Sequence, residues 1–461
     1  MDSSIKERSE ISWLYLTQSL YFFGFFALKS IFVLYLINHH GFSDGQAISL
    51  FASYMCLSYG TSLAGSTIAD KLLGVKNSIL LGGFLSCLGA VCLMTLSAEY
   101  ICLGLAFLSL GMGLTKPNLH TTTGLYFQNP EDPKKDIAYN ISFMVIQIGH
   151  TLASVACGAV ASGFDWNYGI ALVVLSFIAA TYLLNKKVNP EQDNVVFSKE
   201  KLLISLASVS GIIATVYSFL TFRDHSSGVL GLIVCGSLIY LGWIFYQCDH
   251  QERKGMGIII LGLALHTALC SLIEQSGSSI TLFVENAVDR NILGAMVPTP
   301  VFMSFEPMFL VASSLIYIYV SKRNAKLLDA INWSVKAALG FALLGLGFII
   351  LSVGSNNQNA LLSPLWVLSS FFLQMMGEVL IAPTILASIS KNAPPRYKSI
   401  MMGFFVLTIA YGHFIAGFMA QFSVAGQGSH GSFFMVLGLL PLAVAMPLFM
   451  LKGRKMAVKF R

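Results

Sequence analysis

Fourteen apolar stretches, each long enough to cross a membrane as a helix, constrain this chain more than any other feature. A helix needs about 20 mostly apolar residues to span roughly 30 Å of hydrocarbon. With 55% hydrophobic and only 11% charged residues in 461, the chain has too little polar surface for a soluble globule. We therefore predict an all-α integral membrane protein. The stretches are about 11–37, 46–68, 76–97, 100–124, 137–162, 167–185, 200–221, 228–247, 256–283, 298–320, 334–354, 362–389, 399–422 and 432–451.

The lysines and arginines between these stretches predict the orientation. If the N-terminus is cytoplasmic, the loops on that side collect nearly all of these residues, whereas the opposite loops hold only Arg223 and Arg290. Such an asymmetry in short loops places both termini in the cytoplasm. It also accounts for the net charge of +6 without a nucleic acid partner.

Five ionisable residues inside the apolar stretches are sorted by sign. Lys29 and Lys116 lie in the first half, and Glu274, Glu306 and Glu378 lie in the second. A charge at the bilayer centre costs on the order of 2.5–3.5 kcal/mol even on mild insertion scales, so such residues usually face a water-filled path or a ligand. The pattern predicts a polar cavity for a ligand with a positive and a negative end.

The stretches are organised as six, two and six. Residues 186–200 form the longest polar break, and the two stretches after it carry no intramembrane charge. We expect a six-helix bundle at 1–190, an inserted two-helix hairpin with its linkers at 191–254, and a second six-helix bundle at 255–461. Two such bundles around a midplane site resemble the major facilitator superfamily fold, in which one bundle rocks against the other.

A loop motif between the second and third stretches supports that class. The run GSTIADKLLGVK contains Gly65, Asp70, Lys71 and Gly74. It resembles the superfamily's loop signature, in which glycine allows close helix approach and aspartate caps and bridges the bundles. The alternative is a capped turn with topogenic lysines.

Three longer stretches resemble the proton-dependent oligopeptide transporter (POT) family. They are GMGLTKPN at 111–118 followed by GLY at 124–126, IEQSGSS at 273–279 with Asp289 and Arg290 beyond it, and GEVLIAP at 377–383 with Met401 to Gly403 beyond it. The matches fall in both halves, and bacterial members of that family also carry the inserted hairpin.

The resemblance implies roles for individual residues. Lys116 matches the lysine associated with the substrate carboxylate and with proton coupling, and Glu378 matches the glutamate that pairs with the peptide amino terminus. Glu274 matches a glutamate of the cavity, and Tyr59 matches a tyrosine that hydrogen-bonds the substrate. Lys29 replaces an arginine, which keeps the charge but loses the bidentate fork.

The first helix departs from the family pattern. Gln18, Tyr21 and Phe22 stand where the family has a Glu-x-x-Glu-Arg triplet associated with proton coupling, so all three ionisable groups are gone. The usual coupling route is therefore in doubt.

Two further positions differ from the family. Glu306 stands where the family has asparagine, and three readings are open: a relocated proton site, a binder of a cationic group, or one half of a structural ion pair. Gln147 also replaces an asparagine and is expected to line the cavity. Any of four intramembrane histidines could titrate near neutral pH, although a lone histidine is more often a packing residue. They are His120, His150, His266 and His413.

These observations predict a secondary active transporter that imports di- and tripeptides. Proton coupling would run through a non-standard site formed by Glu274, Glu306 or Lys116. The alternatives are an uncoupled facilitator, a transporter of amino acids or small metabolites, and a transporter-derived ligand receptor. We expect a monomer in the bacterial inner membrane whose partners are the peptide, protons and the lipid bilayer.

Other chemistry finds no support in the sequence. No enzyme motif is present, and no cofactor is expected. The eight cysteines lie in or beside apolar stretches without a CxxC pair, so we predict neither disulfides nor a metal site.

Overall fold

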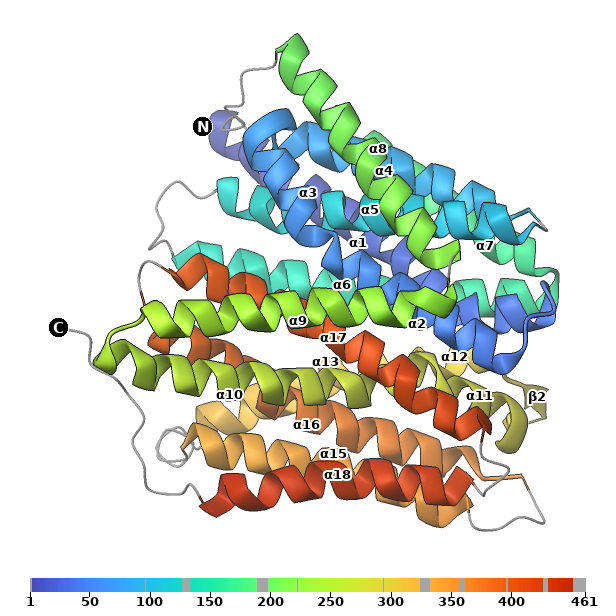
Figure 1. Cartoon of the computed structure of the whole chain (residues 1–461). Coiled ribbons are helices and arrows are strands. Elements are labelled where there is room, and N and C mark those ends of the chain that lie inside the picture. The colour runs from blue at the N-terminus through green and yellow to red at the C-terminus, as the bar shows by residue number, and fades with distance from the viewer. Residues whose placement is uncertain are drawn as a thin grey trace. The chain divides into compact units, whose positions relative to one another are not determined.

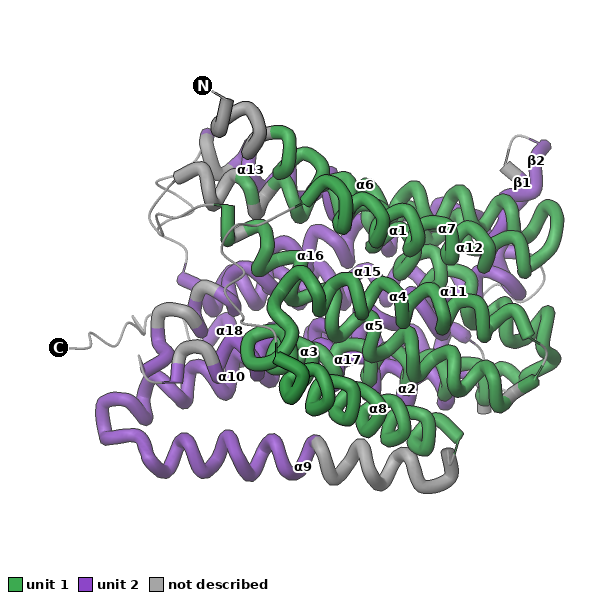
Figure 2. The backbone as a smooth tube through the Cα atoms, turned by 90° about the horizontal axis from the view of Figure 1, so that it is seen from above, with its two compact units in different colours: residues 1–226, 300–307 green, residues 227–299, 308–461 purple. Residues whose placement is uncertain are grey.

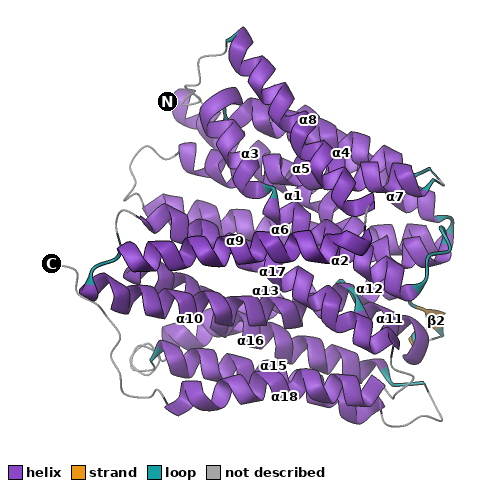
Figure 3. Cartoon of the chain, in the orientation of Figure 1, coloured by secondary structure: helices purple, strands orange, loops and turns teal. Residues whose placement is uncertain are grey.

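The computed structural model describes residues 2–95, 97–126, 133–188, 198–221, 223–292, 294–323, 332–355, 361–394, 397–425 and 430–450. Within these ranges the chain is helical apart from loops and two short strands (Figure 3). In the first half the helices are α1 (Asp2–Asn38), α2 (Asp44–Gly60), α3 (Ser62–Ile68), the π-helix η1 (Ala69–Leu73), α4 (Val75–Leu93), α5 (Ala98–Leu125), α6 (Pro133–Gly163), α7 (Trp166–Lys187) and α8 (Lys199–Thr221).

The second half continues this pattern. Its helices are α9 (Arg223–Gln247), α10 (His250–Ile273), the 3-10 turn η2 (Glu274–Gly277), α11 (Ser279–Ala287), α12 (Thr299–Phe302), α13 (Phe305–Arg323), α15 (Trp333–Ser355), α16 (Pro364–Asn392), α17 (Lys398–Ala425) and α18 (His430–Met450). The strands β1 (Asn291–Ile292) and β2 (Ala295–Met296) pair antiparallel, with Ile292 opposite Ala295.

The prediction of many membrane-spanning helices is confirmed. In the described ranges, thirteen helical segments are long and apolar enough to cross a membrane, and α9 adds the shorter apolar segment Val234–Gln247. Three stretches expected as single helices are interrupted, at Thr61, at Glu274–Gly277, and between α12 and α13. The first break is held by α5, because the Thr61 hydroxyl donates to the carbonyl of Ser109 at 2.7 Å.

The chain forms two compact units. Unit 1 comprises Met1–Ser226 and Pro300–Pro307, and unit 2 comprises Ser227–Thr299 and Met308–Arg461 (Figure 2). In unit 1, α4 packs along α5, α1 packs against α6 and α7, and α8 lies on α5. In unit 2, α15 packs against both α16 and α18, and α10 packs against α16 and α17 (Figure 1).

The two helices of the predicted hairpin attach to different units. Val209 of α8 joins an apolar core with Leu110 and Leu114 of α5 in unit 1. In unit 2, the ring of Tyr240 on α9 stacks on Phe404 of α17 with 6.1 Å between ring centres. Each hairpin helix therefore packs against one of the two units.

Candidate functional site

The cation of Lys116 is held against an aromatic ring in unit 1. Its Nζ atom lies 3.9 Å from the ring centre of Tyr59, which is only 8% exposed. A lysine over a tyrosine face is stabilised by the ring quadrupole, and more strongly where water is scarce. Phe25 meets the Tyr59 ring edge-on, and Lys29 follows Phe25 by one turn of α1. Half-buried Lys29 and Lys116 thus belong to the same bundle.

Gln18 is the centre of a neutral hydrogen-bond network on α1. Its Nε2 donates to the carbonyl of Leu119 at 3.2 Å and to Oγ1 of Thr123 at 2.9 Å. Its Oε1 accepts from the hydroxyl of Ser142 at 2.7 Å. The side chain is completely buried, so this amide ties α1 to α5 and α6. An amide suits this place because it supplies donors and an acceptor together.

The other two positions of the replaced triplet are also neutral and buried. Tyr21 shares a 2.8 Å hydrogen bond with Ser86 of α4, and Phe22 packs against His120 with 6.4 Å between ring centres. His150 of α6 stacks on Phe26 at 3.8 Å. This face of α1 holds the bundle together by packing and uncharged hydrogen bonds.

Gln147 and Glu306 are both buried polar residues of unit 1. Gln147 on α6 is 7% exposed, and its backbone carbonyl accepts a hydrogen bond from Thr151. Glu306 is 8% exposed and lies in the first turn of α13. The partial positive charge at a helix N-terminus stabilises a negative side chain there.

Glu274 lies within ion-pair distance of a histidine in unit 2. Its Oε2 lies 3.3 Å from Nδ1 of His413 on α17, and the two side chains are 12% and 1% exposed. Gln275 fixes the turn that carries Glu274, because its Nε2 donates to the carbonyls of Ser271 and Ala416, each at 3.2 Å. The break in α10 is therefore anchored to α17.

A second histidine reinforces the contact between α10 and α17. Nδ1 of His266 lies 2.6 Å from Oγ1 of Thr408, and its ring stacks on Phe405. Sequence reasoning singled out both histidines but missed their partners. The spacing of four between His266, Cys270 and Glu274 places all three on one side of the helical stretch that runs from α10 into η2.

Glu378 is half-buried on α16 and follows a point of close helix contact. A Cβ atom added to Gly377 would lie 2.6 Å from the carbonyl oxygen of Gly340 on α15. The glycine pair thus fixes the depth at which α16 packs on α15. Glu378 and Glu274 belong to unit 2, whereas Lys116 belongs to unit 1.

The loop motif has a distinctive backbone. A Cβ atom on Gly65 would lie 2.1 Å from the carbonyl oxygen of Gly113, so α3 and α5 are in backbone contact there. Gly74 ends η1 with a φ of 82°, a conformation that favours glycine. Asp70 and Lys71 are exposed on η1. Within the described ranges, no three His, Cys, Asp or Glu residues gather as metal ligands.

Comparison with known proteins adds independent information. The family model described as "POT family" matches residues 76–436. "Dipeptide and tripeptide permease A" of Chromobacterium violaceum is 29% identical over 423 residues, covering 87% of this chain and 83% of the relative. The permease of the same name from Salmonella typhi is 26% identical over 409 residues, covering 87% and 81%.

Solved structures share the fold. A mutant peptide transporter POT in complex with alafosfalin superimposes with a TM-score of 0.86 at 20% identity, covering 96% of this chain and 93% of that chain. A POT family transporter in complex with 5-aminolevulinic acid gives a TM-score of 0.83 at 22% identity, covering 95% of each chain. The predicted major facilitator fold is thereby confirmed. Because the family model matches well over half of the sequence, this chain is a member of the POT family.

Proposed function

We propose that this protein is a secondary transporter that imports di- and tripeptides by alternating access. The observation that carries the proposal is the family match over residues 76–436, which includes Lys116, Glu274, Glu306 and Glu378. The names of the relatives, dipeptide and tripeptide permeases, support the same substrate class. The division into bundles 1–190 and 255–461 joined by the hairpin 191–254 is part of this proposal.

The signs of the charged residues support an assignment of the two ends of the substrate. A free peptide carries a carboxylate and an ammonium group, so we propose that Lys116 and Lys29 bind the former and Glu378 the latter. The ring of Tyr59 supports this by restraining the Lys116 ammonium, since an ordered cation loses less entropy on binding. Gln147 would supply a neutral hydrogen-bonding group.

Proton coupling is proposed to use acids outside α1. Gln18, Tyr21 and Phe22 are neutral and buried in contacts with α4, α5 and α6. The two acids proposed for this role are Glu274, whose Oε2 lies 3.3 Å from Nδ1 of His413, and Glu306, which is 8% exposed. Titration of such a group responds to a nearby cation, which links proton occupancy to substrate occupancy. We also propose a monomer in the inner membrane with both termini cytoplasmic.

Competition for uptake into proteoliposomes tests the substrate class. Entry of a labelled dipeptide should fall with excess unlabelled di- or tripeptide and remain unchanged with excess amino acid. Competition by amino acids alone would assign the protein to small-metabolite transport. Saturable binding without any entry would assign it to a ligand receptor.

A further inference from the structure

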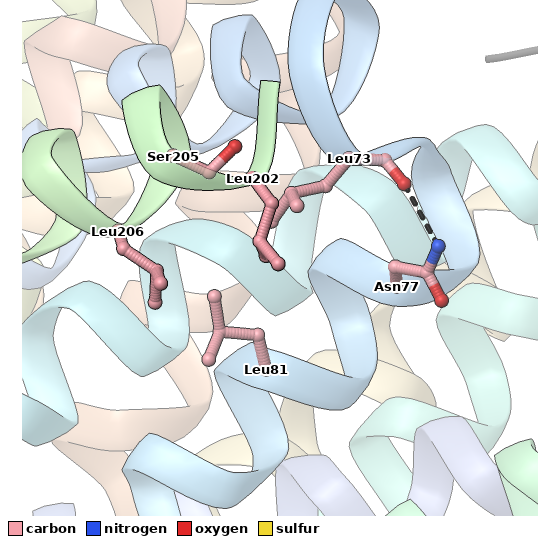
Figure 4. Close-up of a pocket in the computed structure, with 6 residues that line it drawn as sticks. All are labelled: Leu73, Asn77, Leu81, Leu202, Ser205 and Leu206. Atoms are coloured by element: carbon pink, nitrogen blue, oxygen red, sulfur yellow. Dashed lines mark hydrogen bonds between the residues drawn. The ribbon is translucent and has the colours of Figure 1, made fainter. Parts of the chain in front are cut away.

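An apolar groove lies between α8 and the helix pair formed by η1 and α4. It has a volume of about 440 Å³ and is lined by Leu73, Asn77, Leu81, Leu202, Ser205 and Leu206 (Figure 4). All six residues belong to unit 1. Further along α8, Val209 closes onto α5 in a packed core, so the groove is confined to the first two turns of the helix.

The polar side chains of the groove donate to nearby backbone carbonyls. Nδ2 of Asn77 donates to the carbonyl of Leu73 at 2.9 Å (Figure 4), and the Ser205 hydroxyl donates to the carbonyl of Lys201 at 2.7 Å. Both donors already have a hydrogen-bond partner within the protein, so they need no polar ligand. Leu202 and Leu206 remain 36% and 49% exposed. The groove therefore offers an apolar surface that suits a lipid acyl chain.

The end of the groove where α8 begins is positively charged. Lys199 precedes Leu202 by three residues and Lys201 precedes Ser205 by four, so both lysines extend the groove-lining face of α8 by one turn. The loop motif adds one lysine on η1 and one at the start of α4. Among the described residues of η1, the first turn of α4 and the first turn of α8, the charged ones are Lys71, Lys76, Lys199 and Lys201, against Asp70 and Glu200, and Nζ of Lys76 donates to the carbonyl of Asn185 on α7. Cationic excess next to an apolar groove suits an anionic lipid headgroup.

We propose that this groove is a binding site for one anionic phospholipid. One acyl chain occupies the space between Leu81, Leu202 and Leu206, and the headgroup phosphate lies at Lys199 and Lys201. An acyl chain gains no more from the leucines of the groove than from bulk lipid, so selectivity for this lipid comes from the lysines. The bound lipid would fasten α8 to α4 where direct helix packing is incomplete.

Native mass spectrometry in mixed micelles with equal phosphatidylglycerol and phosphatidylcholine tests the proposal. Wild-type protein should retain one phosphatidylglycerol in preference to phosphatidylcholine. Leu206→Trp fills the groove and should abolish this adduct. Leu203→Trp is the matched control, because Leu203 is 68% exposed on the same helix and does not line the groove. Equal retention by the two tryptophan variants would overturn the groove assignment.

The lysines are tested separately. The double variant Lys199→Gln/Lys201→Gln should lose the preference for phosphatidylglycerol at least tenfold, while Lys254→Gln, an exposed lysine of unit 2, should keep it. Inorganic phosphate at millimolar concentration should not displace the lipid, because it lacks the acyl chain. Displacement by phosphate would show a bare anion site, and an unchanged preference in the double variant would contradict the headgroup assignment.

Discussion

Nδ1 of His413 lies 3.3 Å from Oε2 of Glu274, which brings the turn after α10 into contact with α17. The histidine side chain is only 1% exposed, and charges in such places are screened little by water. The contact becomes an ion pair when His413 is protonated, which would strengthen the link between the turn after α10 and α17. This pair is a candidate for converting protonation into helix movement within unit 2.

Removal of either partner should destabilise the protein. We expect Glu274→Gln and His413→Gln each to cost about 1–3 kcal/mol in unfolding free energy, because each leaves a buried polar group without its partner. The double variant should lose less than the sum of the two single losses, since the interaction is removed only once. Thermal unfolding in detergent measures all three. Strictly additive losses would mean that the ion pair contributes nothing.

Tyr59 is expected to set the position of the Lys116 ammonium. Tyr59→Leu removes the ring face and should weaken dipeptide binding about 2- to 30-fold, which corresponds to about 0.5–2 kcal/mol. Tyr59→Phe keeps the face and should retain most of that affinity. Calorimetric titration with a dipeptide compares the variants. If Phe and Leu weaken binding equally, the hydroxyl group and not the ring is what the substrate needs.

Glu378 is expected to recognise the peptide amino group. Glu378→Gln should weaken binding of free dipeptides at least tenfold more than binding of N-acetylated analogues, because only the free ammonium uses the carboxylate charge. Competition binding with both ligands measures the difference. Similar losses for both would remove Glu378 from this role and leave it a structural residue of α16.

Gln18 is expected to act through structure. Gln18→Glu keeps the shape but replaces an N–H donor with an oxygen facing the Leu119 carbonyl and the Thr123 hydroxyl. We predict a loss of about 1–3 kcal/mol in unfolding free energy, measured by thermal denaturation. Gln46→Glu is a control, since Gln46 lies near the surface at the start of α2. A Gln18→Glu protein as stable as wild type would contradict this assignment.

The sequence predicts the membrane class, the helices and the intramembrane charges well, because hydropathy and charge cost act locally along the chain. It misses the breaks at Thr61 and Glu274, since these are held by contacts of Thr61 with Ser109 and of Gln275 with Ala416 that are distant in sequence. The sequence alone shows that Gln18 has no ionisable side chain. The three hydrogen bonds that hold its amide are visible only in the packed bundle.

Glu306 is expected to carry the proton of the transport cycle. Glu306→Gln should abolish accumulation driven by a proton gradient while leaving downhill exchange of labelled dipeptide largely intact, because glutamine keeps the shape but cannot titrate. If exchange slows to the same degree, the acid is better explained as part of a structural ion pair. Persistent accumulation in this variant would move the coupling role to Glu274.

The most direct test of the account is accumulation of a labelled dipeptide in proteoliposomes with and without an inward proton gradient. Wild-type protein should concentrate the peptide above its external level only when the gradient is present, and a protonophore should release it. Empty liposomes and vesicles without a gradient provide the baseline. Uptake that only equilibrates the peptide, with no response to the gradient, would contradict proton-coupled import through residues other than the missing triplet.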